Sequence, residues 1–239
     1  FATDSWKTII NAVKNNNTSK YKVRDTKEVD LGTYGKHTLR ISNMSTPGEC
    51  NQEGFSESAC GFVVEFTDII TTHNMNPSGD HNGKTYQYGW NKDGWPASAM
   101  YKFLNDESDS SSIINLLPKE LKNVIKPTIT VSGRGSEDTV EYFTSTDKLY
   151  LLAPKEIYSD RSSQYDTAKN KTRQLDYYKN IGVTTGNYGG AIKKNNGSDD
   201  WWWLRSAISH SSSPFCTVNT YCAWNGYSAY NTYGASPAF

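Results

Sequence analysis

The last 34 residues of this 239-residue chain, after Arg205, contain no Asp, Glu, Lys or Arg, although these types make up 21% of the sequence. The chain as a whole has no surplus of either sign, because 25 acidic residues balance 25 basic ones. Nothing therefore indicates binding to nucleic acid or to an anionic membrane. No run approaches the roughly 18 apolar residues of a membrane helix. We expect no direct membrane insertion.

Cysteine is also scarce. The four cysteines are too few for a disulfide scaffold at this length, and no CxxC pair occurs to indicate structural zinc. Two alternatives remain open, namely free thiols or a disulfide that joins Cys50 to Cys60 within a loop. The chain begins at Phe1 rather than Met, which indicates a processed or excised piece.

Candidates for metal binding and catalysis are weak. Asp199 and Asp200 are adjacent carboxylates, but calcium needs six to eight oxygens and nothing nearby in the sequence completes the set. Ser209 and His210 stand together in a Ser-rich stretch without an orienting third group, so a surface histidine is favoured over a catalytic base. The prediction is no metal, no cofactor and no catalysis.

Hydrophobic periodicity predicts one α+β domain over residues 1–239, with short helices flanking small mixed sheets and a large loop content. A helix is expected over 4–15 behind an N-cap at Asp4 or Ser5. Short helices follow Pro96 and Pro118, and another covers 174–179. Strands are expected around 29–31, 38–41, 62–70 and 148–153, long loops over 72–94 and 182–200, and a turn over 133–138 with no strand before it.

The tail opens with an apolar strand from Trp201 to Leu204. Alternate side chains point to opposite faces, and both faces are apolar here, which predicts a buried central strand. An exposed tryptophan platform for stacking on sugars is the alternative. Arg205 is expected to pair internally with Asp199 or Asp200. Phe215 and Val218 indicate a second strand.

Between residues 208 and 233 the tail is mostly Ser, Tyr, Asn, Thr and Ala. Antibody loops use this composition to present rigid aromatic area beside adaptable hydrogen-bonding groups. The spacing of Tyr221, Tyr227, Tyr230 and Tyr233 fits neither one strand face nor a buried stripe. The tail therefore predicts a binding surface with its tyrosines presented on loops.

Several motifs point to one family. They are Trp202-Trp203-Leu204-Arg205-Ser206, then Phe215 and Val218, and the terminal Gly234-Ala235-Ser236-Pro237-Ala238-Phe239. Upstream stand Gly94-Trp95-Pro96-Ala97-Ser98, Leu117-Pro118 and Asp147-Lys148-Leu149-Tyr150-Leu151-Leu152. Together they resemble the variable proteins of diversity-generating retroelements found in gut Firmicutes and their phages.

The resemblance implies a C-type lectin-like fold of the branch shared with formylglycine-generating enzymes. In this family a reverse transcriptase randomises template adenines, so that AAY codons become NNY codons. Such codons cannot encode Lys, Glu, Gln, Met or Trp, and the first four are absent from 208–233. Trp224 is then a fixed scaffold position, as are Phe215, Val218, Pro237 and Phe239.

The resemblance implies a ligand-binding region within 201–239, drawn from exposed positions between the scaffold residues. The candidate contact residues are Ile208, Ser209, His210, Ser211, Ser212, Ser213, Asn219, Thr220, Tyr221, Cys222, Asn225, Gly226, Tyr227, Ser228, Tyr230, Asn231, Thr232 and Tyr233.

The function expected from this resemblance is non-catalytic receptor binding or adhesion. The expected partner is a protein or glycan on a target cell surface, and the expected location is extracellular, on a bacterial surface or a phage tail. A carbohydrate-binding lectin module of fixed specificity is one alternative. The other is a copper oxidase of the formylglycine-generating type that uses Cys216 and Cys222.

Overall fold

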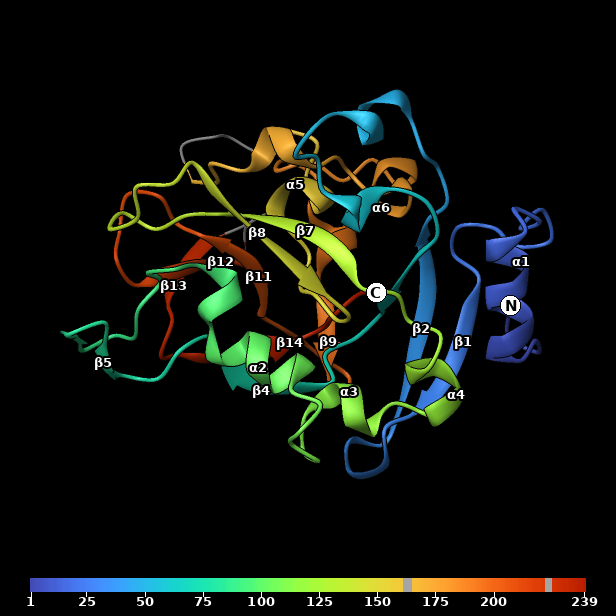
Figure 1. The fold of residues 1–239 in the computed structure, drawn as a ribbon, viewed down its shortest axis with the longest axis horizontal. Helices are drawn as coiled ribbons and strands as arrows, with labels where there is room; N and C mark the ends of the chain where they lie inside the picture. The colour runs from blue at the N-terminus through green and yellow to red at the C-terminus, as the bar shows by residue number, and fades with distance from the viewer. Residues whose placement is uncertain (161–164, 222–224) are drawn as a thin grey trace.

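The computed structural model describes residues 1–160, 165–221 and 225–239. The predicted α+β class is confirmed: the described residues form short helices and five small sheets, joined by long connections (Figure 1). A three-stranded sheet lies beside the N-terminal helix, and a five-stranded sheet lies toward the other end of the molecule.

The α-helices are α1 (Trp6–Lys14), α2 (Ala99–Asn105), α3 (Ile113–Leu116), α4 (Lys119–Lys122), α5 (Pro154–Ile157) and α6 (Asp176–Asn180). The strands are β1 (Thr26–Asp30), β2 (Lys36–Asn43), β3 (Val63–Phe66), β4 (Thr71–Asn74), β5 (Gly79–His81), β6 (Lys84–Tyr86), β7 (Thr128–Gly133), β8 (Tyr142–Asp147), β9 (Lys193–Asn195), β10 (Ser198–Asp200), β11 (Trp202–Ala207), β12 (Pro214–Val218), β13 (Asn225–Ser228) and β14 (Thr232–Ala235).

The N-terminal helix forms as its sequence predicts. The Ser5 hydroxyl caps α1 by accepting a hydrogen bond from the Thr8 amide at 3.1 Å. Trp6 and Ile9, one turn apart, are buried against the rest of the chain. This amphipathic stripe fixes α1 beside the antiparallel sheet β1-β2-β3.

The five-stranded sheet has the order β13-β12-β11-β14-β4. Its central strand, β11, pairs antiparallel with β12 and parallel with β14. Every residue of β11 is buried, which confirms the prediction of a buried central strand. Trp202 and Trp203 are fully enclosed and offer no exposed sugar-stacking face, whereas Trp201 is half-buried.

Arg205 pairs internally, but the predicted partner is wrong. Its guanidinium meets Glu156 of α5 with both side chains fully buried. Asp199 instead pairs with Lys194, and Asp200 accepts a hydrogen bond from Asn195, because β9 and β10 form a hairpin of their own.

Four other expectations need correction. The predicted loop over 72–94 contains β4 and the β5–β6 hairpin. The 182–200 loop contains β9 and β10, and the turn at 133–138 does follow a strand, since β7 pairs with β8. The predicted strand over 148–153 is absent: residues 148 and 149 form a bend, Tyr150 forms an isolated bridge to Ala238, and the Leu152 carbonyl accepts a single hydrogen bond from the Arg205 amide of β11.

A disulfide joins Cys50 to Cys60, which decides between the two alternatives for this pair. No helix in the described part of the chain is long and apolar enough to cross a membrane. The chain ends beside its beginning: Phe239 pairs through its backbone with Val64, and its ring contacts Trp6 at 6.5 Å between centroids.

Candidate functional site

The tail surface is built on two buried strands. In β12, Phe215 and Val218 are fully buried, as predicted for scaffold positions. In β11, the Trp203 indole donates a hydrogen bond from Nε1 to the His73 carbonyl at 2.8 Å, which ties β11 to β4. Trp224 lies outside the described residues. The buried residues of β11 and β12 therefore hold the backbone of the tail surface in place. The side chains exposed on this surface are not needed for that packing.

An aromatic cluster rises from this base: Trp201, Trp203, Tyr221, Tyr227 and Tyr233. The Trp201 ring lies 4.6 Å from Tyr227, 5.4 Å from Tyr233 and 6.2 Å from Tyr221, between centroids. Tyr233 also contacts Trp203 at 5.1 Å. The cluster thus runs without a break from the fully buried Trp203 to Tyr221, whose side chain is 80% exposed.

Strand register explains why these rings meet. Gly234 of β14 is the partner of Trp202, so Tyr233 lies on the opposite face from Trp202, the face of Trp201 and Trp203. Gly234 itself must be small, because a Cβ there would lie 2.6 Å from Ile69. Burial raises the pKa of the Tyr233 phenol, so at neutral pH this residue offers an aromatic ring and a neutral hydroxyl group.

A second exposed patch, the tyrosine pair, consists of Tyr88 and Tyr230. Their rings lie 5.7 Å apart and are 51% and 41% exposed. The Tyr88 carbonyl accepts hydrogen bonds from the Tyr230 amide at 3.2 Å and from the Ser213 hydroxyl at 2.6 Å. A residue from outside the tail is therefore part of the surface.

The sequence prediction missed Tyr88. Its neighbour Gly89 has φ +73°, and a Cβ there would lie 2.7 Å from the Asn76 carbonyl and 2.8 Å from the Tyr230 amide. Only glycine allows the two segments to approach this closely. The available signal was a glycine within the aromatic stretch 86–90, which indicates close backbone approach.

The loop between β11 and β12 forms a third part of the surface. The Asn91 side chain donates hydrogen bonds to the Ser211 and Pro214 carbonyls, both at 2.9 Å. The backbone amide of Asn91 donates to the Ser212 carbonyl. His210 is exposed and its ring contacts Tyr165 at 5.3 Å. Asn91 therefore holds the loop backbone in place, and His210 is the loop residue whose side chain is exposed.

The predicted contact residues divide by exposure. Exposed are His210, Tyr221, Tyr230 and Thr232. Half-buried are Ser209, Ser211, Ser212, Ser213, Thr220, Gly226, Tyr227, Ser228, Asn231 and Tyr233. Cys222 and the side chain of Asn225 lie outside the described part of the structure.

Two predicted contact residues are buried and do not belong to the surface. Ile208 packs under β13, where a Cβ on Gly226 would lie 2.8 Å from its Cγ1. Asn219 is turned inward and its Oδ1 accepts a hydrogen bond from the Tyr221 amide at 2.7 Å. Both shape the backbone that presents the neighbouring side chains.

Residues 67–239 match a family model described as a domain of unknown function, DUF6273. The chain belongs to this family. No curated protein and no solved structure matches it. The DUF6273 segment contains the five-stranded sheet, the aromatic cluster and both members of the tyrosine pair, whereas α1 to β3 precede it.

The copper-oxidase and calcium-lectin alternatives would each need metal ligands that converge. Among the described residues no three His, Cys, Asp or Glu side chains converge to hold a metal ion. Cys216 is buried in β12, and its proposed oxidase partner Cys222 lies outside the described residues. What the tail surface provides is aromatic rings, hydroxyl groups and amides without charge, a combination suited to binding.

Proposed function

We propose that this DUF6273 chain is a non-catalytic ligand-binding domain, of the receptor-binding or adhesin type, with a C-type lectin-like fold. The tail surface contacts a protein or glycan on a target cell. One observation carries the proposal: Tyr221 and Tyr230 are exposed on a backbone that buried strands hold in place. Large rigid side chains presented in this way are typical of binding hot spots.

Diversification by a retroelement accounts for the composition of the surface. A diversified position must accept almost any side chain, so it needs an exposed side chain over a fixed backbone. His210, Tyr221, Tyr230 and Thr232 meet this condition, and their residue types are all accessible to NNY codons. The buried Phe215 and Val218 lie between His210 and Tyr221 in the sequence and serve as scaffold.

The proposed location is outside the cell, on a bacterial surface or a phage tail. The Cys50–Cys60 disulfide supports this, because disulfides form and persist mainly in oxidising compartments. The disulfide precedes the DUF6273 segment in the sequence, and neither cysteine is among the proposed contact residues of the tail surface.

The diversification is tested in the neighbouring DNA. We expect a near-copy of the sequence encoding the tail, differing from it at adenines, beside a reverse transcriptase gene. The codons for exposed positions should differ between copies, and those for Phe215 and Val218 should not. A locus with neither element would contradict the retroelement part of the proposal and leave a domain of fixed specificity.

Binding itself is tested with a glycan array and with intact bacterial cells, each with and without a calcium chelator. The proposal expects retained binding in chelator, because the tail surface uses rings, hydroxyls and amides. A single sugar bound only with calcium would indicate a lectin module of fixed specificity instead.

A further inference from the structure

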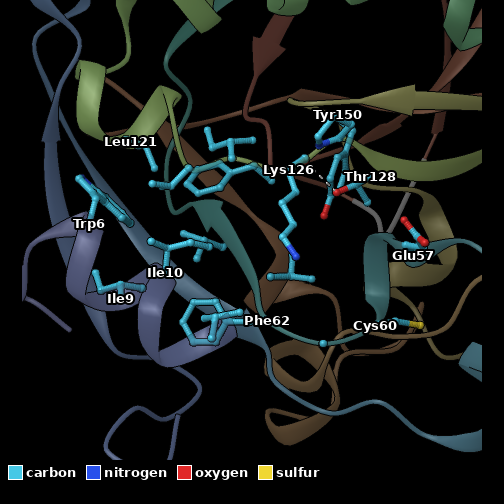
Figure 2. Close-up of a pocket in the computed structure, with 18 of the residues that line it drawn as sticks. Trp6, Ile9, Ile10, Glu57, Cys60, Phe62, Leu121, Lys126, Thr128 and Tyr150 are labelled. Atoms are coloured by element: carbon cyan, nitrogen blue, oxygen red, sulfur yellow. Dashed lines mark hydrogen bonds between the residues drawn. The ribbon is translucent and has the colours of Figure 1, made fainter. Parts of the chain in front are cut away.

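An apolar pocket is lined in part by α1 (Figure 2). Figure 1 places α1 at the end of the molecule opposite β5 and β13. The volume of the pocket is about 440 Å³. The lining combines α1, the segment after α4, the start of β3 and the chain end, and includes Ile10, Val13, Phe62, Val124, Tyr150 and Phe239. The tail residues proposed to bind a target do not line it.

The size and lining of this pocket are those of a small-molecule site. Ligand pockets typically span about 300–1,000 Å³ and combine apolar walls with a few polar groups that fix orientation. Here the walls come from segments far apart in sequence, since α1 begins at Trp6 and Phe239 ends the chain. These segments therefore leave an open apolar pocket that no side chain of the lining fills.

Two charged side chains line the pocket, Lys126 and Glu57. Figure 2 shows the Lys126 side chain extending across the space between Phe62 and Glu57. Glu57 Oε2 accepts a hydrogen bond from the Ile129 amide at 2.9 Å, which holds that carboxylate at the wall. Within the described residues no carboxylate lies within ion-pair distance of the Lys126 ammonium, so it is available to an anionic ligand.

We propose that this pocket binds a free medium-chain carboxylic acid, with the alkyl chain among the apolar side chains and the carboxylate beside Lys126. Apolar walls select the chain, and the one cation at the pocket selects an anionic head group. An uncharged chain of the same length gains the same burial but lacks the ion pair.

Isothermal titration calorimetry of the intact chain with hexanoate, octanoate and decanoate tests the alkyl site. We expect the Kd to fall by up to about fourfold for each added methylene, the factor given by burying one CH₂ group. A Kd that does not depend on chain length, or no binding of decanoate, would overturn the proposal. Tighter binding to phosphatidylcholine vesicles than to decanoate would also overturn it, since the source would then be a membrane.

Charge variants test the head-group site. Lys126→Met should raise the Kd for decanoate about fivefold at low salt and leave the Kd for decanol unchanged. Glu57→Gln keeps a hydrogen-bond acceptor for Ile129 but removes the repelling charge, so it should lower the Kd for decanoate. Lys119→Met, an exposed lysine of α4 that does not line the pocket, is the matched control. Equal effects of the two lysine variants would refute the head-group assignment.

A filling variant tests the location. Ile10→Trp places a larger side chain in the pocket and should abolish decanoate binding while the melting temperature stays close to that of the parent. If Ile10→Trp does not fold, Ile10→Ala serves instead, because removing wall contacts should weaken decanoate more than hexanoate. Unchanged affinity in the folded variant would place the ligand elsewhere. The ligand-free chain could instead form a dimer, and Ile10→Trp could abolish that dimer. This result would show that a second copy of the chain occupies the pocket, and it would overturn the proposal.

Discussion

Arg205 and Glu156 form a fully buried ion pair that joins β11 to α5 across 49 residues of sequence. Arg205 donates from Nη1 to Glu156 Oε2 at 2.7 Å and from Nη2 to Oε1 at 2.5 Å. It also donates to the Val131 and Leu151 carbonyls. The Arg205 side chain thereby connects β11, on which the tail surface is built, to β7, to α5 and to the segment that precedes α5.

Removing one partner of this pair should be strongly destabilising. Glu156→Ala leaves the guanidinium buried without its counter-ion, and we expect a loss of about 3–5 kcal/mol in the free energy of unfolding. Urea unfolding followed by circular dichroism measures this loss. Glu141→Ala, an exposed glutamate between β7 and β8, is the control and should change it by no more than about 0.5 kcal/mol. Similar values for both variants would contradict the role of the pair.

Trp203 and Tyr221 occupy the two ends of the aromatic cluster and should respond oppositely to truncation. Trp203→Ala removes a fully buried ring and should cost about 3–5 kcal/mol of stability. Tyr221→Ala should leave the melting temperature nearly unchanged, because its side chain faces solvent. Differential scanning calorimetry measures the melting temperatures of the two variants. A Trp203→Ala variant as stable as the parent would show that the packing of β11 does not depend on this ring.

The tyrosine pair should contribute to binding as a unit. Tyr230→Ala and Tyr88→Ala should each weaken target binding by about 2 kcal/mol, roughly thirtyfold in Kd, with little loss of stability. Because the rings are in contact, the double variant should lose less than the sum of the two. Val140→Ala removes an exposed apolar side chain outside the tail and serves as the control. Normal affinity in both single variants would contradict the proposed surface.

His37 should make stability depend on pH. Its Nδ1 lies 3.0 Å from Asp68 Oδ2 and its Nε2 lies 3.0 Å from the Tyr34 carbonyl, so both nitrogens face acceptors. The hydrogen bond to Asp68 raises the pKa of the imidazole above its ordinary value. The protonated ring therefore stabilises the folded state most below the unfolded pKa of about 6.5, and this contribution disappears as pH rises through the higher folded value.

The measurement is urea unfolding from pH 5.5 to 8.5 for the parent and for His37→Asn. The difference in unfolding free energy between the two should shrink as pH increases through the folded pKa. Comparing the two chains cancels the titration of the other histidines. A constant difference across this range would mean that folding does not change the pKa of His37.

The disulfide should stabilise the domain by constraining its unfolded chain. Cys50 and Cys60 are separated by 10 residues, a short loop for which closure entropy corresponds to about 2–3 kcal/mol. The variant Cys50→Ala/Cys60→Ala should lose this amount in guanidinium unfolding, and reductant should not change it further. The parent should approach the variant when reduced. Equal stability of parent and variant under oxidising conditions would contradict this estimate.

Local sequence signals predicted the elements that depend on local physics. The Ser5 cap and the buried stripe of α1 were both evident, as was the all-apolar strand β11. Two hairpins were missed although their signals were present: Asn82-Gly83 and Asn196-Gly197 connect β5 to β6 and β9 to β10. All four residues have positive φ, the conformation that Asn-Gly favours in two-residue hairpin turns.

Long-range pairings could not be predicted from the sequence. The charge of Arg205 indicated an internal partner, but its partner, Glu156, is supplied by a distant helix, and proximity in sequence favoured the wrong aspartates. The predicted contact residues differ from the observed surface for the same reason. Tyr88 was not predicted because it contacts the tail only after folding, and Ile208 was predicted although β13 covers it. The strand β8 lacked the apolar alternation that would have revealed it, whereas β7 carries that alternation in Thr128 to Ser132 and was still missed.

The contact between the Trp6 and Phe239 rings has a practical consequence for orientation. Both chain ends lie near α1, whereas β5 and β13 lie at the other end of the molecule (Figure 1). A sensor chip or bead that holds the domain by an N-terminal tag will therefore leave the tyrosines facing the solution. The same attachment places the apolar pocket nearest the support. The two proposed sites therefore require the domain to be attached at opposite ends.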